Sequence, residues 1–287
     1  VAEHYGRQVL GIAETDFVFS TAKLFFAYGL GNSLAFPLAH GATALLMAER
    51  ATPEAVFARL ARHRPSLFFA VPTLYASMLA HPDLPAREAM RVRHFISAGE
   101  ALPAEVGRRW AARFGVDVLD GLGSTEMLNT FLSNRPGDLR YGTTGRPVPG
   151  YEVRLVDEEG RILDGGETGE LQIRGPSSAT AYWNNREHSQ ATFLGPWVRS
   201  GDKYSRTADG YYVYAGRSDD MLKVSGIYVS PIEVESALVS HEAVLEAAVV
   251  GDTDADGLTK PRAFVVLKDG HRPTPELAEA LKRHVKE

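Results

Sequence analysis

The stretch "DGLGSTEMLNTF", residues 120–131, places flexible backbone, two hydroxyls and a carboxylate side by side. Gly121 and Gly123 would let a ligand approach the backbone closely. Thr125 could donate a hydrogen bond to a phosphate oxygen, and Glu126 could hold Mg²⁺. A turn capped by its serine and threonine would account for the same residues equally well. The segment therefore predicts either a phosphate and metal loop or an ordinary turn.

Two segments further along the chain combine glycine with charged side chains. In "VRSGD", residues 198–202, Asp202 follows a glycine, and its carboxylate could accept hydrogen bonds from both hydroxyls of a ribose. In "GRSDDMLKVSG", residues 216–226, Arg217 is suited to a ribose or a phosphate. Taken singly, a solvated turn and an exposed charge cluster are the simpler explanations. Only their combination with the other segments gives them weight.

A fourth segment, "SAGEALP" (residues 97–103), is a glycine-containing loop after a predicted strand. Ligands often bind at that end of parallel strands, although a plain connection to a helix is equally common. Other chemistries are absent from the sequence, which has no GxxxxGK[ST] or HExxH motif and only scattered histidines. The lack of cysteine excludes disulfides, thiolate metal sites and a cysteine nucleophile, and it fits a reducing cytosol.

Short apolar runs alternate with helical patterns over residues 43–120 and predict the sheet that would position these segments. The runs at 42–47, 67–71, 94–97 and 116–119 have the composition of buried strands. Thr52 followed by Pro53 predicts one helix start and Pro103 another, while Gly115 predicts the end of the second helix. This rhythm of strand, helix and strand indicates a parallel α/β sheet.

The pattern changes after residue 133. Residues 134–150 form a loop rich in Gly and Pro, and residues 151–157 and 169–175 alternate apolar and polar side chains as in an antiparallel ribbon. A third region predicts a helix over 231–239, strands over 243–250 and 262–268, and a helix from Pro275. The predicted fold class is α/β, with a parallel sheet, an antiparallel β ribbon or barrel, and a smaller α+β part at the C-terminal end.

Charge and hydropathy argue against two classes of partner. A formal charge of −5 over 287 residues favours neither nucleic acid nor an anionic membrane surface. Residues 24–48 contain no Asp, Glu, Lys or Arg and are long enough to span a bilayer. However, Gly29, Gly31 and Pro37 would interrupt a membrane helix and leave backbone groups unpaired in lipid. We therefore predict buried strand, loop and helix over this range.

The four segments, in this order, resemble the motifs of the adenylate-forming acyl-CoA synthetase family. "GSTE" matches the family's YGxTE, "SGD" its TGD, and "GRSDDMLKVSG…IEVE" its GRxDDxxKxxGxxxxxxEIE. "KLFFAYGLGNSLAFPL", "ISAGEALP" and "STEMLNTFLSNRPGDLRYGTTGRPVPGYE" look most similar to benzoate-CoA ligases. The resemblance implies that a carboxylic acid reacts with ATP to give an acyl-adenylate, from which the CoA thiol displaces AMP. It also implies Mg²⁺ as a cofactor.

The resemblance further implies roles for individual residues. Thr125 and Glu126 would be catalytic, with Thr125 on the α-phosphate and Glu126 on Mg²⁺. Asp219 would be the hinge of a rotating small domain, and Gly226 would lie beside the pantetheine tunnel for CoA. The nucleotide would be bound by Gly99, Glu100, Ala101, Asp120, Gly121, Gly123, Ser124, Thr125, Asp202 and Arg217. The aromatic acid would contact Ala27, Tyr28, Leu128, Asn129 and Thr130.

Measured against this family, the chain resembles a fragment. Residues 1–217 would be the C-terminal portion of the large AMP-binding domain, and residues 218–287 a truncated small domain. The family's phosphate loop would precede Val1, and its catalytic lysine would follow Glu287. Leu122 also stands where many members carry the tyrosine of YGxTE.

The predicted acid pocket departs from the benzoate pattern. Asn129 and Thr130 stand where benzoate-CoA ligases usually carry His and Ile. A buried amide or hydroxyl left unpaired costs about 1–3 kcal/mol, and a ring hydroxyl could pair with one or both. We therefore expect a hydroxybenzoate, for example 4-hydroxybenzoate, ahead of benzoate. If a water filled the gap, benzoate would remain the substrate.

Two other functions stay open. The chain could be a nucleotide-binding module without catalysis, or part of an adenylating enzyme that loads a carrier protein, although the benzoate-ligase strings argue against the latter. For the leading function we expect a cytoplasmic enzyme whose partners are an aromatic carboxylate, ATP and CoA, with no nucleic acid and no membrane. A homodimer is left open.

The 287 residues alone are expected not to form an acyl-adenylate, because the phosphate loop and the lysine of the family lie outside them. Exchange of labelled pyrophosphate into ATP, measured with benzoate present, checks this. Exchange above the protein-free background would contradict it.

Overall fold

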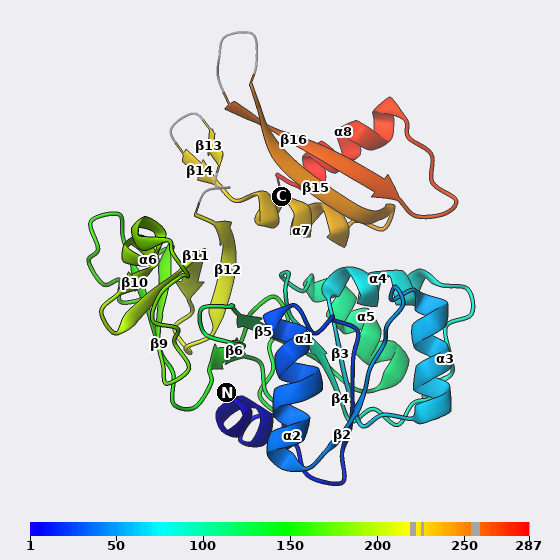
Figure 1. Cartoon of the computed structure of the whole chain (residues 1–287). Coiled ribbons are helices and arrows are strands. Elements are labelled where there is room, and N and C mark those ends of the chain that lie inside the picture. Colours follow the sequence, from blue (N-terminus) through cyan, green and yellow to red (C-terminus); the bar gives the residue numbers. More distant parts are fainter. Residues whose placement is uncertain (219–221, 225–226, 254–258, 287) are drawn as a thin grey trace.

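A seven-stranded sheet forms the first layer of the protein (Figure 1). The computed structural model describes residues 1–218, 222–224, 227–253 and 259–286. The strands of this sheet are β1 (Phe17–Ser20), β2 (Thr43–Leu45), β3 (Leu67–Ala70), β4 (His94–Ser97), β5 (Val118–Gly123), β6 (Thr130–Ser133) and β7 (Arg146–Pro147). Their spatial order is β2-β1-β3-β4-β5-β6-β7, and β1 to β5 pair in parallel whereas β6 and β7 are antiparallel.

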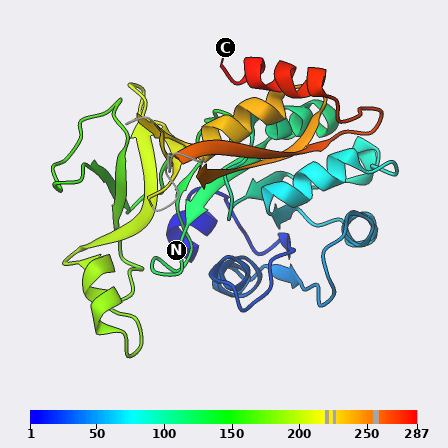
Figure 2. The same cartoon turned by 90° about the horizontal axis from the view of Figure 1, so that it is seen from above.

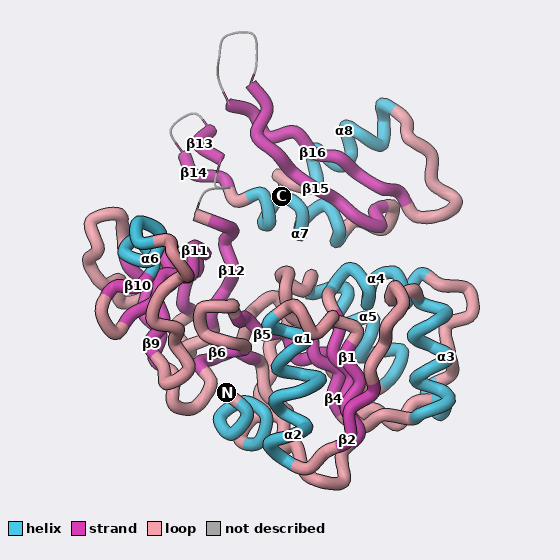
Figure 3. Tube along the Cα trace, viewed as in Figure 1, coloured by secondary structure: helices cyan, strands magenta, loops and turns pink. Residues whose placement is uncertain are grey.

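Helices cover both faces of this sheet (Figure 3). They are η1 (Ala2–Arg7), α1 (Ala27–Leu30), η2 (Gly31–Ala35), α2 (Phe36–His40), α3 (Pro53–His63), α4 (Pro72–Ala80), η3 (Arg87–Ala89) and α5 (Ala104–Phe114). η1 and α2 pack on one face, and α3, α4 and α5 pack on the other. On the second face the buried ring of Trp110 meets Tyr75 and Phe95 edge to face. Because both faces are covered, the central strands are continuous apolar runs.

A second, antiparallel sheet packs against the first. It contains β8 (Glu152–Val156), β9 (Gly169–Arg174), β10 (Phe193–Leu194), β11 (Trp197–Arg206) and β12 (Tyr212–Arg217), with α6 (Arg186–Thr192) before β10. The order is β10-β11-β9-β8, and β12 also pairs with β11. Leu171, Ile173 and Tyr204 from this sheet share one apolar core with Leu119 and Phe131 of the first sheet. The two sheets are therefore held together by apolar burial.

The C-terminal part contains two hairpins and two helices above the large part (Figure 1). Its elements are β13 (Leu222–Val224), β14 (Ile227–Val229), α7 (Pro231–Ser240), β15 (Val244–Thr253), β16 (Thr259–Leu267) and α8 (Pro275–His284). Leu238, Val244, Val249 and Leu281 form its small core. Seen from above, α7 lies over α5 (Figure 2). Residues of α7 line a cleft together with Pro103 and Val106.

Most local signals of the sequence are confirmed. Thr52 caps α3 by accepting a hydrogen bond from the Ala55 amide at 3.4 Å, and Gly115 ends α5 with a φ of 67°. The predicted parallel strands, the ribbon of β8 and β9, and α7, β15, β16 and α8 are all present. Elements that the sequence did not predict include β1, α4, β6, α6 and β12. In the part of the chain that the structure describes, no helix is long and apolar enough to cross a membrane.

The prediction that residues 24–48 are buried is wrong in part. The range does contain α1, η2, α2 and β2. Its outer face is nevertheless open, with Phe25 80% and Leu38 75% exposed. The range is apolar but has no clear helical periodicity. Its composition therefore could not show whether the protein buries all of its side chains or only those on one face.

Asp16, which precedes β1, joins it to the segments that lead into β3 and β4. Its carboxylate accepts hydrogen bonds from the Ser66 hydroxyl at 2.7 Å, from Arg93 Nη2 at 2.7 Å and from the Ala13 amide at 2.9 Å. Burial alone would raise the pKa of Asp16, but these hydrogen bonds lower it below its ordinary value. The stability it contributes is thus present above the ordinary carboxyl pKa and is lost as pH falls through the lowered one.

Asp16→Asn is expected to lower the free energy of unfolding by about 2 kcal/mol at pH 7, because it leaves the partly buried Arg93 without its counter-charge. Urea unfolding at pH 7 and at pH 3 measures the change, and the difference from wild type should shrink at the lower pH. Glu3→Gln, which removes an exposed ion pair with Arg7, is the control and should change little. An equal loss in the two variants would contradict the assigned role.

Candidate active site

A cavity of about 580 Å³ lies where the carboxyl ends of β4 and β5 face the second sheet. It brings together ten of the residues predicted to bind the nucleotide or the metal, from segments that are far apart in the sequence. These residues are Gly99, Glu100, Ala101, Asp120, Gly121, Gly123, Ser124, Glu126, Asp202 and Arg217. Thr125 is exposed at the tip of the turn beside the cavity, and Leu122 is part of the cavity wall.

The chain reverses sharply at the end of β5. A Cβ atom on Gly123 would lie 2.6 Å from the carbonyl carbon of Asn129, so only glycine allows β6 to approach this closely. Within the turn, the Met127 amide donates to the Ser124 hydroxyl at 3.3 Å, and Leu128 has a φ of 69°. Ser124 is therefore a turn-capping residue, as the simpler interpretation predicted, and it also lines the cavity.

Asp120 presents a buried acceptor to the cavity. The residue is 7% exposed, and its Oδ1 atom is inaccessible and has no hydrogen-bond partner. Burial raises the pKa of Asp120 well above its ordinary range, and nearby donors only partly offset this. A buried acceptor without a donor costs free energy.

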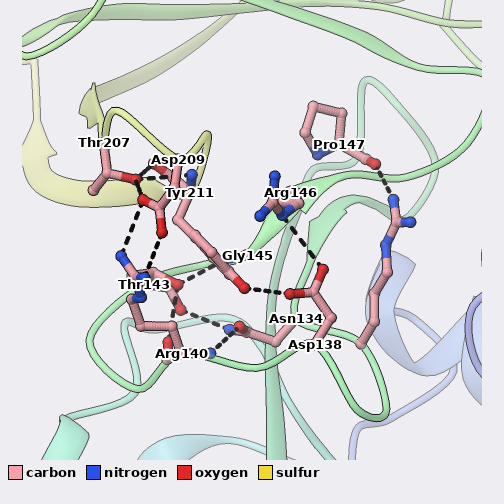
Figure 4. Close-up of polar contacts among 11 residues, drawn as sticks. Asn134, Asp138, Arg140, Thr143, Gly145, Arg146, Pro147, Thr207, Asp209 and Tyr211 are labelled. Atoms are coloured by element: carbon pink, nitrogen blue, oxygen red, sulfur yellow. Dashed lines mark hydrogen bonds and ion pairs between the residues drawn. The ribbon is translucent and has the colours of Figure 1, made fainter.

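Asn134 connects the loop that follows it with β5, and Figure 4 shows its side chain beside Thr143 and Arg140. Its amide nitrogen Nδ2 donates to the Thr143 carbonyl at 2.7 Å, its Oδ1 accepts from the Arg140 amide at 3.0 Å, and its own backbone N–H donates to the Asp120 carbonyl at 2.9 Å. Next to Thr143, the Thr144 hydroxyl lies 3.1 Å from the Tyr204 hydroxyl, and Thr144 and Tyr204 both line the cavity. The loop at 134–147 thus contributes Thr144 to the cavity wall.

Tyr211 anchors this loop to the second sheet (Figure 4). Its ring lies under the guanidinium groups of Arg140, at 4.5 Å, and Arg146, at 4.3 Å. Its hydroxyl donates to Asp138, and Arg140 also pairs with Asp209. Such cation–π contacts and ion pairs are individually modest, but here they connect one loop at several points. The sequence predicted only a flexible Gly- and Pro-rich loop, because none of these partners is local.

Strand pairing brings Asp202 and Arg217 together at another edge of the cavity. The two residues are register partners on β11 and β12, and Arg217 Nη1 lies 3.4 Å from Asp202 Oδ1. Gly201, with a φ of 76°, leaves room for the Arg217 side chain, which would lie 3.0 Å from a Cβ atom there. Asp202 is buried, and its amide donates to the Ser200 hydroxyl at 3.0 Å. The arrangement can present a carboxylate and a cation to one polar ligand.

Glu126 lies on the α6 side of the cavity. Burial would raise the pKa of Glu126, but the hydrogen bond from Tyr182 and other local donors outweigh burial and lower it. The carboxylate is therefore ionised at neutral pH. Among the described residues no group of three or more His, Asp or Glu side chains could hold a metal ion. The single carboxylate suits Mg²⁺ held together with phosphate oxygens of a nucleotide.

Of the five residues predicted to contact the acid, Ala27, Asn129 and Thr130 are joined by hydrogen bonds, and none of the five is part of the cavity lining. Ala27 and Tyr28 come from α1, and the Asn129 amide donates to the Ala27 carbonyl at 3.1 Å. Asn129 Oδ1 accepts from the Thr130 amide at 2.8 Å and from the Thr130 hydroxyl at 2.9 Å. The polar groups of Asn129 and Thr130 therefore already pair with each other and with the Ala27 carbonyl, so a ring hydroxyl is not their only partner.

Two predicted positions are not described by the structure, whereas several unpredicted residues line the cavity. The predicted hinge Asp219 and tunnel residue Gly226 lie outside the described residues. The sequence did not single out other residues that line the cavity, namely Thr144, Glu170, Tyr182, His188, Thr192, Arg199, Ser200, Tyr204 and Tyr214. The aromatic run "TAYWNN" was the available signal for Tyr182, but nothing in it indicates the distant partner.

Two family models match this sequence. The model described as AMP-binding enzyme matches residues 2–183, and the model described as AMP-binding enzyme C-terminal domain matches residues 233–287. The chain belongs to the AMP-binding enzyme family. Its fold, with a parallel sheet, an antiparallel sheet and a smaller C-terminal part, is that of adenylate-forming enzymes.

Several members of the AMP-binding family are close relatives over almost the whole chain. The chain is 68% identical to a benzoate–CoA ligase of Thauera aromatica over 99% of its residues and 54% of that protein. It is 53% identical to a 4-hydroxybenzoate–CoA/benzoate–CoA ligase of Rhodopseudomonas palustris over 100% of its residues and 53% of that protein. The chain therefore spans about half the length of the curated relatives it matches.

A solved structure of a benzoate CoA ligase from Burkholderia xenovorans LB400 matches with a TM-score of 0.95 at 64% identity, over 99% of this chain and 57% of the other. An anthranilate CoA ligase solved with anthranoyl-AMP matches with a TM-score of 0.94 at 45% identity, over 99% of this chain and 55% of the other. At these identities the AMP-binding fold is shared in detail.

Asp120→Asn is expected to make the ligand-free protein more stable by roughly 1–3 kcal/mol at pH 8, because it removes a carboxylate whose ionised form is disfavoured by burial. Because burial raises the pKa of Asp120, the native state binds a proton more tightly than the unfolded chain, and wild-type stability falls as pH rises above the ordinary carboxyl value. The advantage of the variant should therefore grow with pH and disappear in acid.

Thermal unfolding from pH 4 to pH 8 measures the effect. Asp83→Asn, at an exposed carboxylate, is the matched control and should show no such trend. A variant that is less stable than wild type at every pH would show that the Asp120 carboxylate has a stabilising partner.

Proposed function

We propose that the protein containing this chain is an ATP-dependent ligase that activates an aromatic carboxylic acid as an acyl-adenylate and transfers the acyl group to CoA. One observation carries the proposal: the Asp120 carboxylate, the Asp202–Arg217 pair and the ionised Glu126 all lie on the walls of a single cavity. These groups complement an adenine amine, a ribose or phosphate, and a metal-bound phosphate. The names of the close relatives support the same reaction.

In the first step, a carboxylate oxygen of the acid would attack the α-phosphorus of ATP, and pyrophosphate would leave. In the second, the CoA thiol would attack the acyl carbonyl, and AMP would leave. Mg²⁺, when bound, would neutralise charge on the phosphates. Glu126 would hold the cation, Thr125 would donate to the α-phosphate, and the other groups would position the nucleotide, so that orientation and fixed charges lower the barrier.

The remaining assignments are proposals of the same kind. Gly99, Glu100 and Ala101 would line the adenine, Asp120 would accept from its amine, and Gly121, Gly123 and Ser124 would complete that wall. Asp219 would serve as the hinge and Gly226 would lie beside the CoA tunnel, both on the strength of the motif alone. We place the boundary between the large and small domains at residues 217 and 218. A cytoplasmic location and a homodimer remain predictions.

We propose that benzoate, rather than a hydroxybenzoate, is the preferred acid substrate. Ala27, Tyr28, Leu128, Asn129 and Thr130 are the proposed pocket. Both side-chain oxygens of Asn129 and Thr130 and one amide hydrogen are already engaged in hydrogen bonds, so a ring hydroxyl is not needed to satisfy them. Burying a polar group against an unsubstituted ring costs less free energy when that group is already hydrogen-bonded than when it is unpaired.

The test is AMP release that depends on both CoA and ATP, in the chain extended to the length of its relatives. Benzoate should give the highest kcat/KM among benzoate, the three hydroxybenzoates, 2-aminobenzoate and acetate. Replacing Asn129 by His and Thr130 by Ile should leave benzoate preferred. A clear preference for a hydroxybenzoate that the double variant abolishes would overturn the proposed order.

Two other functions are distinguished by the same assay. AMP release that requires an acyl carrier protein rather than CoA would identify a carrier-loading enzyme. Nucleotide binding without AMP release for any acid, in the extended chain, would identify a binding module.

A further inference from the structure

A strap formed by residues 175–185 crosses the turn that carries Glu126. The strap leaves β9 and leads to α6, and it contacts the turn at three points. The Ala179 amide donates to the Glu126 carbonyl at 2.7 Å, and the Ser177 hydroxyl donates to the Met127 carbonyl at 2.7 Å. The third contact is made by Tyr182. The strap therefore fixes both the backbone and the side chain of the turn.

Tyr182 is the strap residue that reaches the Glu126 carboxylate itself. Its hydroxyl donates to Glu126 Oε1 at 2.6 Å, a short distance typical of a hydrogen bond to an ionised acceptor. The bond engages Oε1 of the carboxylate and so fixes one of its two oxygens. Tyr182 and Glu126 both line the cavity, so the bond is made at the wall where a nucleotide would lie.

The position of the Tyr182 ring is itself constrained. The ring stacks on His188 of α6 at 4.5 Å between centroids and packs against Phe193 at 5.3 Å. The Tyr182 amide donates to the Ser189 hydroxyl at 2.9 Å, which ties the residue to the same helix. A phenol held in this way cannot follow large rotations of the Glu126 side chain, so it restricts the carboxylate to one orientation.

We propose that Tyr182 is a positioning residue that orients the Glu126 carboxylate for a divalent cation carried by the nucleotide. The inference rests on the proposed function, because it assumes that Glu126 is the metal ligand. Partners that hydrogen-bond to a ligating carboxylate fix its direction and commonly change metal affinity when they are removed. Tyr182 acts through Glu126 and would touch neither the acid nor CoA.

Tyr182→Phe removes only the hydroxyl and keeps the stack on His188. In the extended chain with a non-hydrolysable ATP analogue, the affinity for Mn²⁺, measured by electron paramagnetic resonance, is expected to fall roughly tenfold. Binding of the analogue in the presence of a chelator should not change, because the adenine and ribose contacts remain. Excess Mg²⁺ should restore kcat, so that the defect is confined to the metal dependence.

Tyr151→Phe is the matched control. It also removes one buried tyrosine hydroxyl that anchors the strap, through the Ser177 hydroxyl at 2.7 Å, but it does not touch Glu126. Its affinity for Mn²⁺ should equal that of wild type. An equal loss in the Tyr151 and Tyr182 variants would show that docking of the strap in general is responsible, and would overturn the orienting role of Tyr182.

Glu126→Gln separates the inference from the function on which it rests. If this variant loses Mn²⁺ affinity and Tyr182→Phe does not, the role of Tyr182 is wrong while the proposed site stands. If neither variant changes Mn²⁺ affinity, Glu126 is not the metal ligand, and both the inference and that part of the proposed function fail.

Discussion

The close approach of backbone at Gly123 is the constraint on which the site depends. β5 runs parallel to β4 up to Asp120, and three residues later its glycine lies against the Asn129 carbonyl as the chain returns in β6. Any side chain at position 123 would push β6 away. The turn between these strands would then shift, and Glu126 and Asn129 would move with it.

Around this fixed turn the site is assembled from contacts that are each modest. The loop at 134–147 is held by Asn134 and Tyr211, and the strap at 175–185 by Tyr182 and Ser177. Both segments are long connections without regular structure, which are normally the mobile parts of a domain. Here hydrogen bonds and ring contacts attach them to the strand ends, so the cavity walls are preorganised before a nucleotide binds.

The parts of this arrangement that were predictable from sequence are those with local causes. Thr52, Gly115 and the apolar runs of β3 and β4 gave elements close to the observed ones, because caps and periodicity act within a few residues. The segments that line the cavity were singled out through resemblance to family motifs. Tyr182 was missed because its partner lies 56 residues away, and the pairing of Asn129 with Thr130 was not predicted because a rotamer cannot be inferred from residue types.

Asp120 and Glu126 are carboxylates six positions apart whose surroundings shift their pKa values in opposite directions. Asp120 is buried with Oδ1 unpaired, and burial raises its pKa; Glu126 is also partly buried, yet donors led by Tyr182 lower its pKa. The first group therefore gains most from a ligand that donates a hydrogen bond, and the second from one that brings a positive charge. The proposed nucleotide with its divalent cation would supply the donor and the charge at the two sides of one cavity.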